Sequence, residues 1–286
     1  MAKEKRIPKE YAIVVSLIMF FTVVIVVGIT RVYLVTKDRL NRMDLSAIDV
    51  LEVDTNIDLS SYNIRIADAI RRDYGVDIYY GDDLSLESVN AVPVTDPDNI
   101  FDMLRQVNAV LSKYPKDLVH EIESKDYTIS IYLVDHFTNG IEALANRNTS
   151  GQMKIYIGNT IDFERALHHE YYHILDYYIR LENDESIIYK DWDKYNPRGF
   201  MYSGDVNNIT SKYIYYGESG AYFVTPYAKY SEKEDKAETF AEMITASKDE
   251  IFFNEGEPIN GKISVIKKTL YNVFESVRRE PILAWE

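Results

Sequence analysis

The sequence predicts a domain of the α+β class that is preceded by one membrane-spanning helix. Three observations lead to this prediction. Residues 11–30 form a run of 20 residues without a charge. Residues 59–286 change repeatedly between helical and strand periodicity, with Gly, Pro and Asp at the boundaries. Three histidines fall within residues 168–173, inside one predicted helix.

The N-terminal region divides into a tail at 1–10, a membrane anchor at 11–30 and a stalk at 31–58. An uncharged run of this length can cross a bilayer as a helix. A secretory signal peptide, with secretion after cleavage, is the alternative. It usually has a shorter apolar region and a cleavage site of small residues, and Gly28-Ile29-Thr30-Arg31 does not supply one.

The orientation of this anchor is less constrained by the sequence. Basic residues occur on both sides of the segment, so the positive-inside rule gives a tie. A short N-terminal tail before a single span is typical of a signal anchor, and we therefore expect residues 59–286 to lie outside the cell. A domain facing the cytoplasm is the alternative.

The elements of the domain follow from periodicity and from boundary residues. Serine at 60–61 suggests the start of the first helix, Asp96-Pro97 the start of the second, and Asp162 the cap of the third. Residues 183–226 are irregular and long enough to be a functional lid. The predicted helices cover 61–74, 96–114, 163–180, 232–247 and 263–274, and the predicted strands cover 76–80, 127–134 and 153–157.

Composition excludes several functions. The chain has 46 acidic and 32 basic residues and a net charge of −14, which argues against a nucleic-acid partner. It has no cysteine, so a cysteine protease and a cysteine-ligated zinc finger are both excluded.

The strongest chemical signal is the sequence H-E-x-x-H at residues 169–173. His169 and His173 are four residues apart, so on a helix both imidazoles face one metal ion. Glu170 then lies beside the ion, where a carboxylate can take a proton from an attacking water and pass it to a leaving amine. This is the arrangement of zinc peptidases. The other histidines are given no metal-binding role: His120, His136 and His168.

A catalytic zinc site needs three protein ligands and one open position. Glu234, Glu238 and Glu242 are spaced four residues apart on the predicted helix 232–247 and therefore share one face. The sequence does not fix the rotation of this helix, so both Glu234 and Glu238 are candidates for the third ligand. A solvated acidic face without a metal is the alternative.

These segments resemble a known family. H-E-x-x-H, a long intervening segment, Y-x6-E from Tyr227 to Glu234 and then Ala237-Glu238 are similar to the catalytic domain of anthrax lethal factor and of the clostridial Pro-Pro endopeptidases. The resemblance covers residues 60–275. It implies a zincin-like fold for the domain at 59–286, with Glu234 as the third zinc ligand. It also implies that the Tyr227 hydroxyl assists the tetrahedral intermediate and that Glu238 lies beside the ligands without binding the metal.

We therefore predict a membrane-anchored zinc metalloendopeptidase that hydrolyses peptide bonds of protein or peptide substrates. The alternative is a catalytically inactive zincin-like module that binds peptide or cell-envelope material. An intramembrane protease is rejected, because the motif helix carries Glu164, Arg165 and Asp176 and is remote from residues 11–30.

Overall fold

The structure is a computed structural model that describes residues 58–148, 150–183, 189–205, 207, 209, 220–246 and 257–282. The chain divides into two units, residues 1–54 and 55–286, and every described residue belongs to the second. The predicted anchor at 11–30 and nearly all of the predicted stalk lie outside the described residues. No helix in the described ranges has both the length and the apolar character needed to cross a bilayer.

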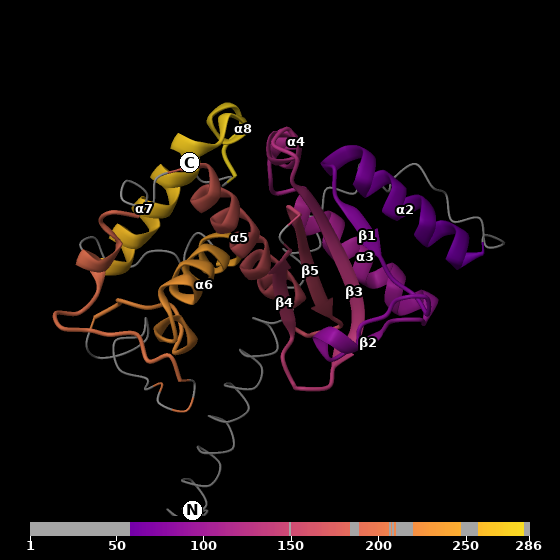
Figure 1. The fold of residues 1–286 in the computed structure, drawn as a ribbon, viewed down its shortest axis with the longest axis horizontal. Coiled ribbons are helices and arrows are strands. Elements are labelled where there is room, and N and C mark those ends of the chain that lie inside the picture. Colours follow the sequence, from indigo (N-terminus) through magenta and orange to yellow (C-terminus); the bar gives the residue numbers. More distant parts are fainter. Residues whose placement is uncertain are drawn as a thin grey trace, which may run out of the picture. The chain divides into compact units, whose positions relative to one another are not determined.

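A five-stranded mixed sheet forms the N-terminal half of the domain (Figure 1). The central strand β3 pairs in parallel with β1 and β5, and β4 pairs antiparallel with β5. β2 pairs antiparallel with the last residues of β3. The order β1-β3-β5-β4 places β4 at one end of the sheet. The strands are β1 (Asp77–Tyr79), β2 (Ala91–Pro93), β3 (Thr128–Phe137), β4 (Ala143–Arg147) and β5 (Gln152–Gly158).

The core follows from period-2 alternation in β3 and β5. Alternate residues of these strands are buried, and they belong to one apolar cluster with the helices that flank the sheet. The buried strand residues are Ile129, Ile131, Leu133, Met153, Ile155 and Ile157. The N-terminal helices are α2 (Leu59–Tyr74), α3 (Pro97–Leu111) and α4 (Asp117–Glu123), and the short helix η2 (Glu87–Val89) precedes β2.

The long helix α5 (Phe163–Glu182) lies between the sheet and the C-terminal helices (Figure 1). It contacts β4 and β5 on one side and α6 (Glu232–Thr245) on the other. α6 contacts α7 (Pro258–Val273), and α8 (Glu275–Arg279) follows. Two short helices, η3 (Trp192–Tyr195) and η5 (Tyr227–Lys229), contact α7 and α6 respectively.

The mixed α+β class is confirmed, and each predicted helix and strand is present with shifted ends. Some details were wrong. Asp58, rather than a serine, caps the first helix, since its carboxylate accepts the Ser60 amide at 3.3 Å. Asp162 precedes α5 without a side-chain capping bond. The segment between β3 and β5, expected to be a loop, contains β4, and a further helix, α4, begins two residues after Pro115.

Candidate metal centre

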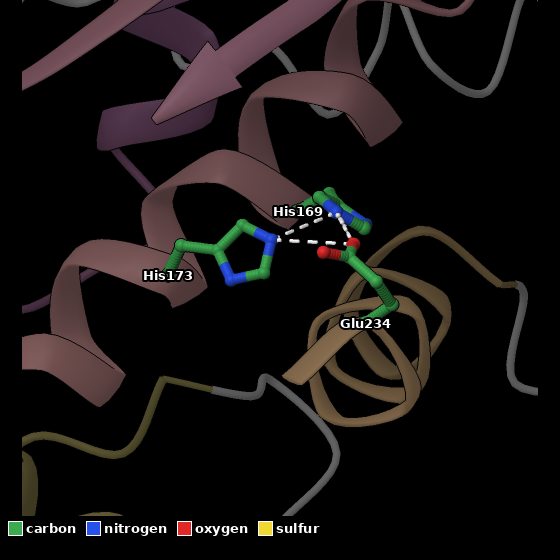
Figure 2. A group of neighbouring side chains, drawn as sticks. All are labelled: His169, His173 and Glu234. Carbon is green, nitrogen blue, oxygen red and sulfur yellow. Dashed lines mark hydrogen bonds and ion pairs between the residues drawn. The ribbon is translucent and has the colours of Figure 1, made fainter. Parts of the chain in front are cut away.

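Helix α5 supplies two imidazoles one turn apart. His169 and His173 are both buried, their ring centroids are 4.8 Å apart and their Nε2 atoms are 3.1 Å apart (Figure 2). Apolar residues on the other sides of α5, such as Leu167 and Ile174, are fully buried and fix the rotation of the helix. The predicted shared face of the two histidines is thereby directed at α6.

The first turn of α6 supplies a carboxylate. Glu234 Oε2 lies 3.0 Å from His169 Nε2 and 3.4 Å from His173 Nε2 (Figure 2). The Ser231 hydroxyl caps this helix by accepting the Glu234 amide at 3.3 Å, which fixes the backbone that carries the carboxylate.

These three donors fit a zinc ion. Zinc binds histidine nitrogen and carboxylate oxygen at about 2.0–2.2 Å, and two ligands on a tetrahedron of that radius are about 3.3–3.6 Å apart. The three donor atoms, Nε2 of His169, Nε2 of His173 and Oε2 of Glu234, are 3.0, 3.1 and 3.4 Å apart, which is close to this spacing. Within the described residues, one group of potential metal ligands lies close enough together to share an ion. Its members are His169, His173 and Glu234.

The electrostatics of the group favour positive charge at its centre. Burial lowers the pKa of His169, but hydrogen bonds to Glu234 and Glu238 outweigh it and raise the pKa to about 10. Burial raises the pKa of Glu234, but His169 and His173 outweigh it and hold the pKa at about 2. A divalent cation supplies this charge when it replaces the proton on the imidazole, because metal ligands must be deprotonated.

Glu238 contacts the opposite nitrogen of the same imidazole. Its Oε1 accepts a hydrogen bond from His169 Nδ1 at 2.8 Å, while Glu234 faces Nε2. Arg165 donates to both oxygens of Glu238, at 3.2 and 2.6 Å. A carboxylate in this position orients the imidazole of a metal ligand and fixes its tautomer. The geometry thus separates the two glutamates that the sequence left as alternatives.

Glu170 lies beside the histidines and is buried. Burial raises its pKa above the ordinary glutamate range, even though the neighbouring His169 and His173 act in the opposite direction. The backbone N–H of Ala145 in β4 donates a hydrogen bond to the Glu170 carboxylate. The carboxylate therefore lies between the histidines and the end strand of the sheet.

Tyr227 approaches from η5. Its ring centroid is 6.2 Å from that of His169, and its ring stacks on Tyr230 at 5.8 Å. The side chain is 41% exposed. Burial and then the charges of Glu234 and Glu170 raise its pKa, so the phenol stays protonated at neutral pH and can donate a hydrogen bond. Among the described tyrosines, Tyr227 is the one whose ring lies against His169.

Several contacts around this group were not predicted. Arg165 lies one turn before His169, so helical spacing alone could have suggested it. Thr225, which donates to Glu238 at 2.7 Å, and Ala145 carry no signal in the sequence. Their positions depend on how β4 and the segment before η5 pack against α5.

The predicted lid at 183–226 is described at 189–205, 207, 209 and 220–226. Not all of its aromatic side chains reach the surface, since Trp192 is 1% exposed and its indole N–H donates to Asp235 at 3.2 Å. A groove of about 620 Å³ lies between residues 193–202 and Glu232. Met201 is 86% exposed and is one of the residues that line this groove.

Comparison with known proteins gives one solved structure and one family. The structure is titled "Crystal structure of a putative zinc-binding metallo-peptidase from Bacteroides caccae ATCC 43185". It is 19% identical, covers 76% of this chain and 87% of its own, and superposes with a TM-score of 0.44. No curated protein matches the chain. A family model described as "Putative zinc-binding metallo-peptidase" matches residues 66–257, a range that includes every residue of the site described above. The chain belongs to this family of zinc-binding metallopeptidases.

Proposed function

We propose that this protein is a zinc-dependent metalloendopeptidase that hydrolyses peptide bonds of protein substrates. The observation that carries the proposal is the convergence of His169, His173 and Glu234 within ligand-to-ligand distances, with Glu170 and Tyr227 beside them. His169, His173 and Glu234 would hold the zinc. Two imidazoles and one carboxylate leave one position open, which distinguishes a catalytic zinc site from a structural one.

Bound zinc would polarise the scissile carbonyl and lower the pKa of water towards neutrality. Glu170 would accept the proton of the attacking water and return it to the leaving amine. Tyr227 would donate a hydrogen bond to the oxyanion that develops on the carbonyl oxygen. Glu238 would keep the His169 imidazole in the tautomer whose Nε2 is free to bind.

The position of β4 favours a substrate that binds in an extended conformation. The strand directly before the motif helix, β5, offers no open edge, because it pairs with β3 on one side and with β4 on the other. β4 is at the end of the strand order, and Ala145 in it contacts Glu170. A peptide added along β4 by backbone hydrogen bonds would pass the catalytic carboxylate.

The closer relationship to anthrax lethal factor and the Pro-Pro endopeptidases is part of this proposal. It rests on the spacing of Tyr227, Glu234 and Glu238 after the H-E-x-x-H motif, together with the roles that their positions suggest. Attachment to the membrane through residues 11–30, with the catalytic unit on the extracellular side, is a further part. It rests on the uncharged 20-residue run and the short N-terminal tail.

The test is zinc content and peptide cleavage of the full-length chain, purified in a mild detergent, beside two variants. Glu170→Gln removes the proposed base, and Glu182→Gln removes an exposed carboxylate at the end of the same helix. We expect one zinc per chain in all three proteins and cleavage of a peptide library by the wild type and Glu182→Gln alone. Undiminished cleavage by Glu170→Gln would contradict the assigned base. Zinc without cleavage in the wild type would instead support a binding module.

A further inference from the structure

The side chain of Thr225 connects the two halves of the proposed site. One half is the metal ligand His169 with the carboxylate of Glu238 behind it. The other half is η5, the single turn that carries Tyr227. Thr225 lies two residues before Tyr227 and contacts both halves through its hydroxyl group.

The first contact is with Glu238, which is 4% exposed. The Thr225 hydroxyl donates to Glu238 Oε2 at 2.7 Å. The same oxygen accepts from Arg165 at 2.6 Å, while Oε1 faces His169 Nδ1 at 2.8 Å. With two donors on Oε2, the carboxylate is held in the plane that presents Oε1 to the imidazole. Loss of either donor leaves this carboxylate freer to rotate away from His169.

The second contact is with the turn itself. The Thr225 hydroxyl oxygen accepts the backbone N–H of Ala228 at 3.2 Å, three residues along the chain. This bond satisfies a donor at the start of η5, as a threonine does at the N-terminus of a helix. The opposite end of the turn is held by backbone bonds from Ser203 to Lys229 and from Gly204 to Tyr230. Thr225 is thus the side chain that ties the start of the turn to the ligand helices.

We propose that Thr225 is a positioning residue that aligns the Tyr227 hydroxyl with the zinc site through Glu238. One hydroxyl group both donates to the carboxylate that orients His169 and accepts from the turn that presents Tyr227. The orientation of the metal ligand and the placement of the oxyanion donor are therefore set together. This inference rests on the proposed peptidase activity for its effect on turnover, but its effect on zinc binding is independent of that activity.

The experiment compares Thr225→Val with Thr225→Ser, in the wild-type chain and in the Tyr227→Phe background. Valine keeps the shape of threonine and removes both hydrogen bonds, whereas serine keeps the hydroxyl. Thr245→Val is the matched control, since it removes a threonine hydroxyl that bonds only within α6, to Ala241 at 2.9 Å. Zinc affinity is measured by competition with a chelator, and turnover is measured at saturating zinc.

For Thr225→Val we expect the zinc Kd to rise roughly tenfold to a hundredfold and kcat to fall by about tenfold or more, as losses of outer-shell partners do. KM should change little. Serine should restore both quantities, and Thr245→Val should match the wild type. Because Thr225 acts on turnover through Tyr227, its replacement should have little further effect on kcat in the Tyr227→Phe background.

An equal fold-loss of kcat in both backgrounds would overturn the proposal, and so would unchanged Kd and kcat in Thr225→Val. If the wild-type chain cleaves no peptide, the proposed function fails, and the zinc Kd alone decides the link from Thr225 to Glu238. If Thr225→Val does not fold, Thr225→Ala is compared with Thr225→Ser in the same way.

Discussion

A buried ion pair behind the proposed metal centre allows a quantitative test of the packing. Lys262 of α7 and Asp235 of α6 are both fully buried, and Lys262 Nζ lies 2.6 Å from Asp235 Oδ2. The same oxygen accepts the hydroxyl of Tyr202 at 2.8 Å and the indole N–H of Trp192 at 3.2 Å. The ammonium group also lies 3.8 Å from the centre of the Phe223 ring. These contacts join α6, α7 and the segment around η3 next to Glu234, the proposed third ligand.

Replacing Lys262 by methionine leaves the volume nearly unchanged and removes the only cation on Asp235 within the described residues. Burial already raises the pKa of Asp235 to about 6, with Lys262 opposing it. Breaking a buried pair from one side costs about 3–5 kcal/mol, and the two remaining donors on Oδ2 favour the lower end of that range. For a unit of this size, that corresponds to a fall in Tm of about 6–20 °C.

The assay is thermal unfolding of the zinc-free full-length chain, followed by tryptophan fluorescence, to which Trp192 and Trp285 both contribute. The double variant Asp235→Leu with Lys262→Met removes both charges, and we expect it to recover most of the lost stability, because an apolar pair of similar volume is often neutral. A Tm for Lys262→Met within 2 °C of the wild type, with ~1 kcal/mol or less lost, would refute the reasoning. So would a double variant less stable than Lys262→Met alone.

Three further predictions concern the site, the contact between η3 and α7, and the topology. Tyr227→Phe should lower kcat by about 10²–10³-fold with KM nearly unchanged, because the proposed role of the lost hydroxyl is to stabilise the transition state; a change in KM alone would contradict this role. Gly261→Ala should destabilise the protein by about 1–3 kcal/mol, because a Cβ there would lie 2.0 Å from the ring of Tyr195; the Tm is compared with that of Ser264→Ala on the same helix, and equal values would contradict the clash. Ile64→Cys introduces a single thiol at an exposed position into a chain that has no cysteine. A membrane-impermeant maleimide should label it on intact cells, and labelling only after permeabilisation would favour a cytoplasmic domain.

The parts of the site that depend on spacing along one helix could be predicted from the sequence. His169, Glu170 and His173 are within one turn of each other, so helical geometry alone directs the two histidines to one face. Arg165 lies four residues before His169, so the same spacing places it on this face. The structure brings these side chains together because the rest of α5 is buried on its other sides.

The contacts between elements could not be predicted in the same way. Glu234 and Glu238 are equally spaced candidates. They face different nitrogens of His169 because buried residues of α6, such as Ala237 and Phe240, set the rotation of that helix against α5. β4 has the sequence Ala-Leu-Ala-Asn-Arg, too short and too polar to give a strand signal. Trp192 illustrates the same limit, since an irregular segment does not reveal which of its aromatic residues are buried.

The central claim is that His169, His173 and Glu234 hold one zinc ion. The most direct measurement is anomalous X-ray diffraction from crystals of the zinc-loaded protein, with data collected above and below the zinc absorption edge. We predict one strong anomalous peak about 2.0–2.2 Å from the Nε2 atoms of His169 and His173 and from a carboxylate oxygen of Glu234, with Glu238 bound to His169 Nδ1 instead. A peak at another group of side chains, a peak coordinated by Glu238 in place of Glu234, or the absence of a peak at this position would contradict the account.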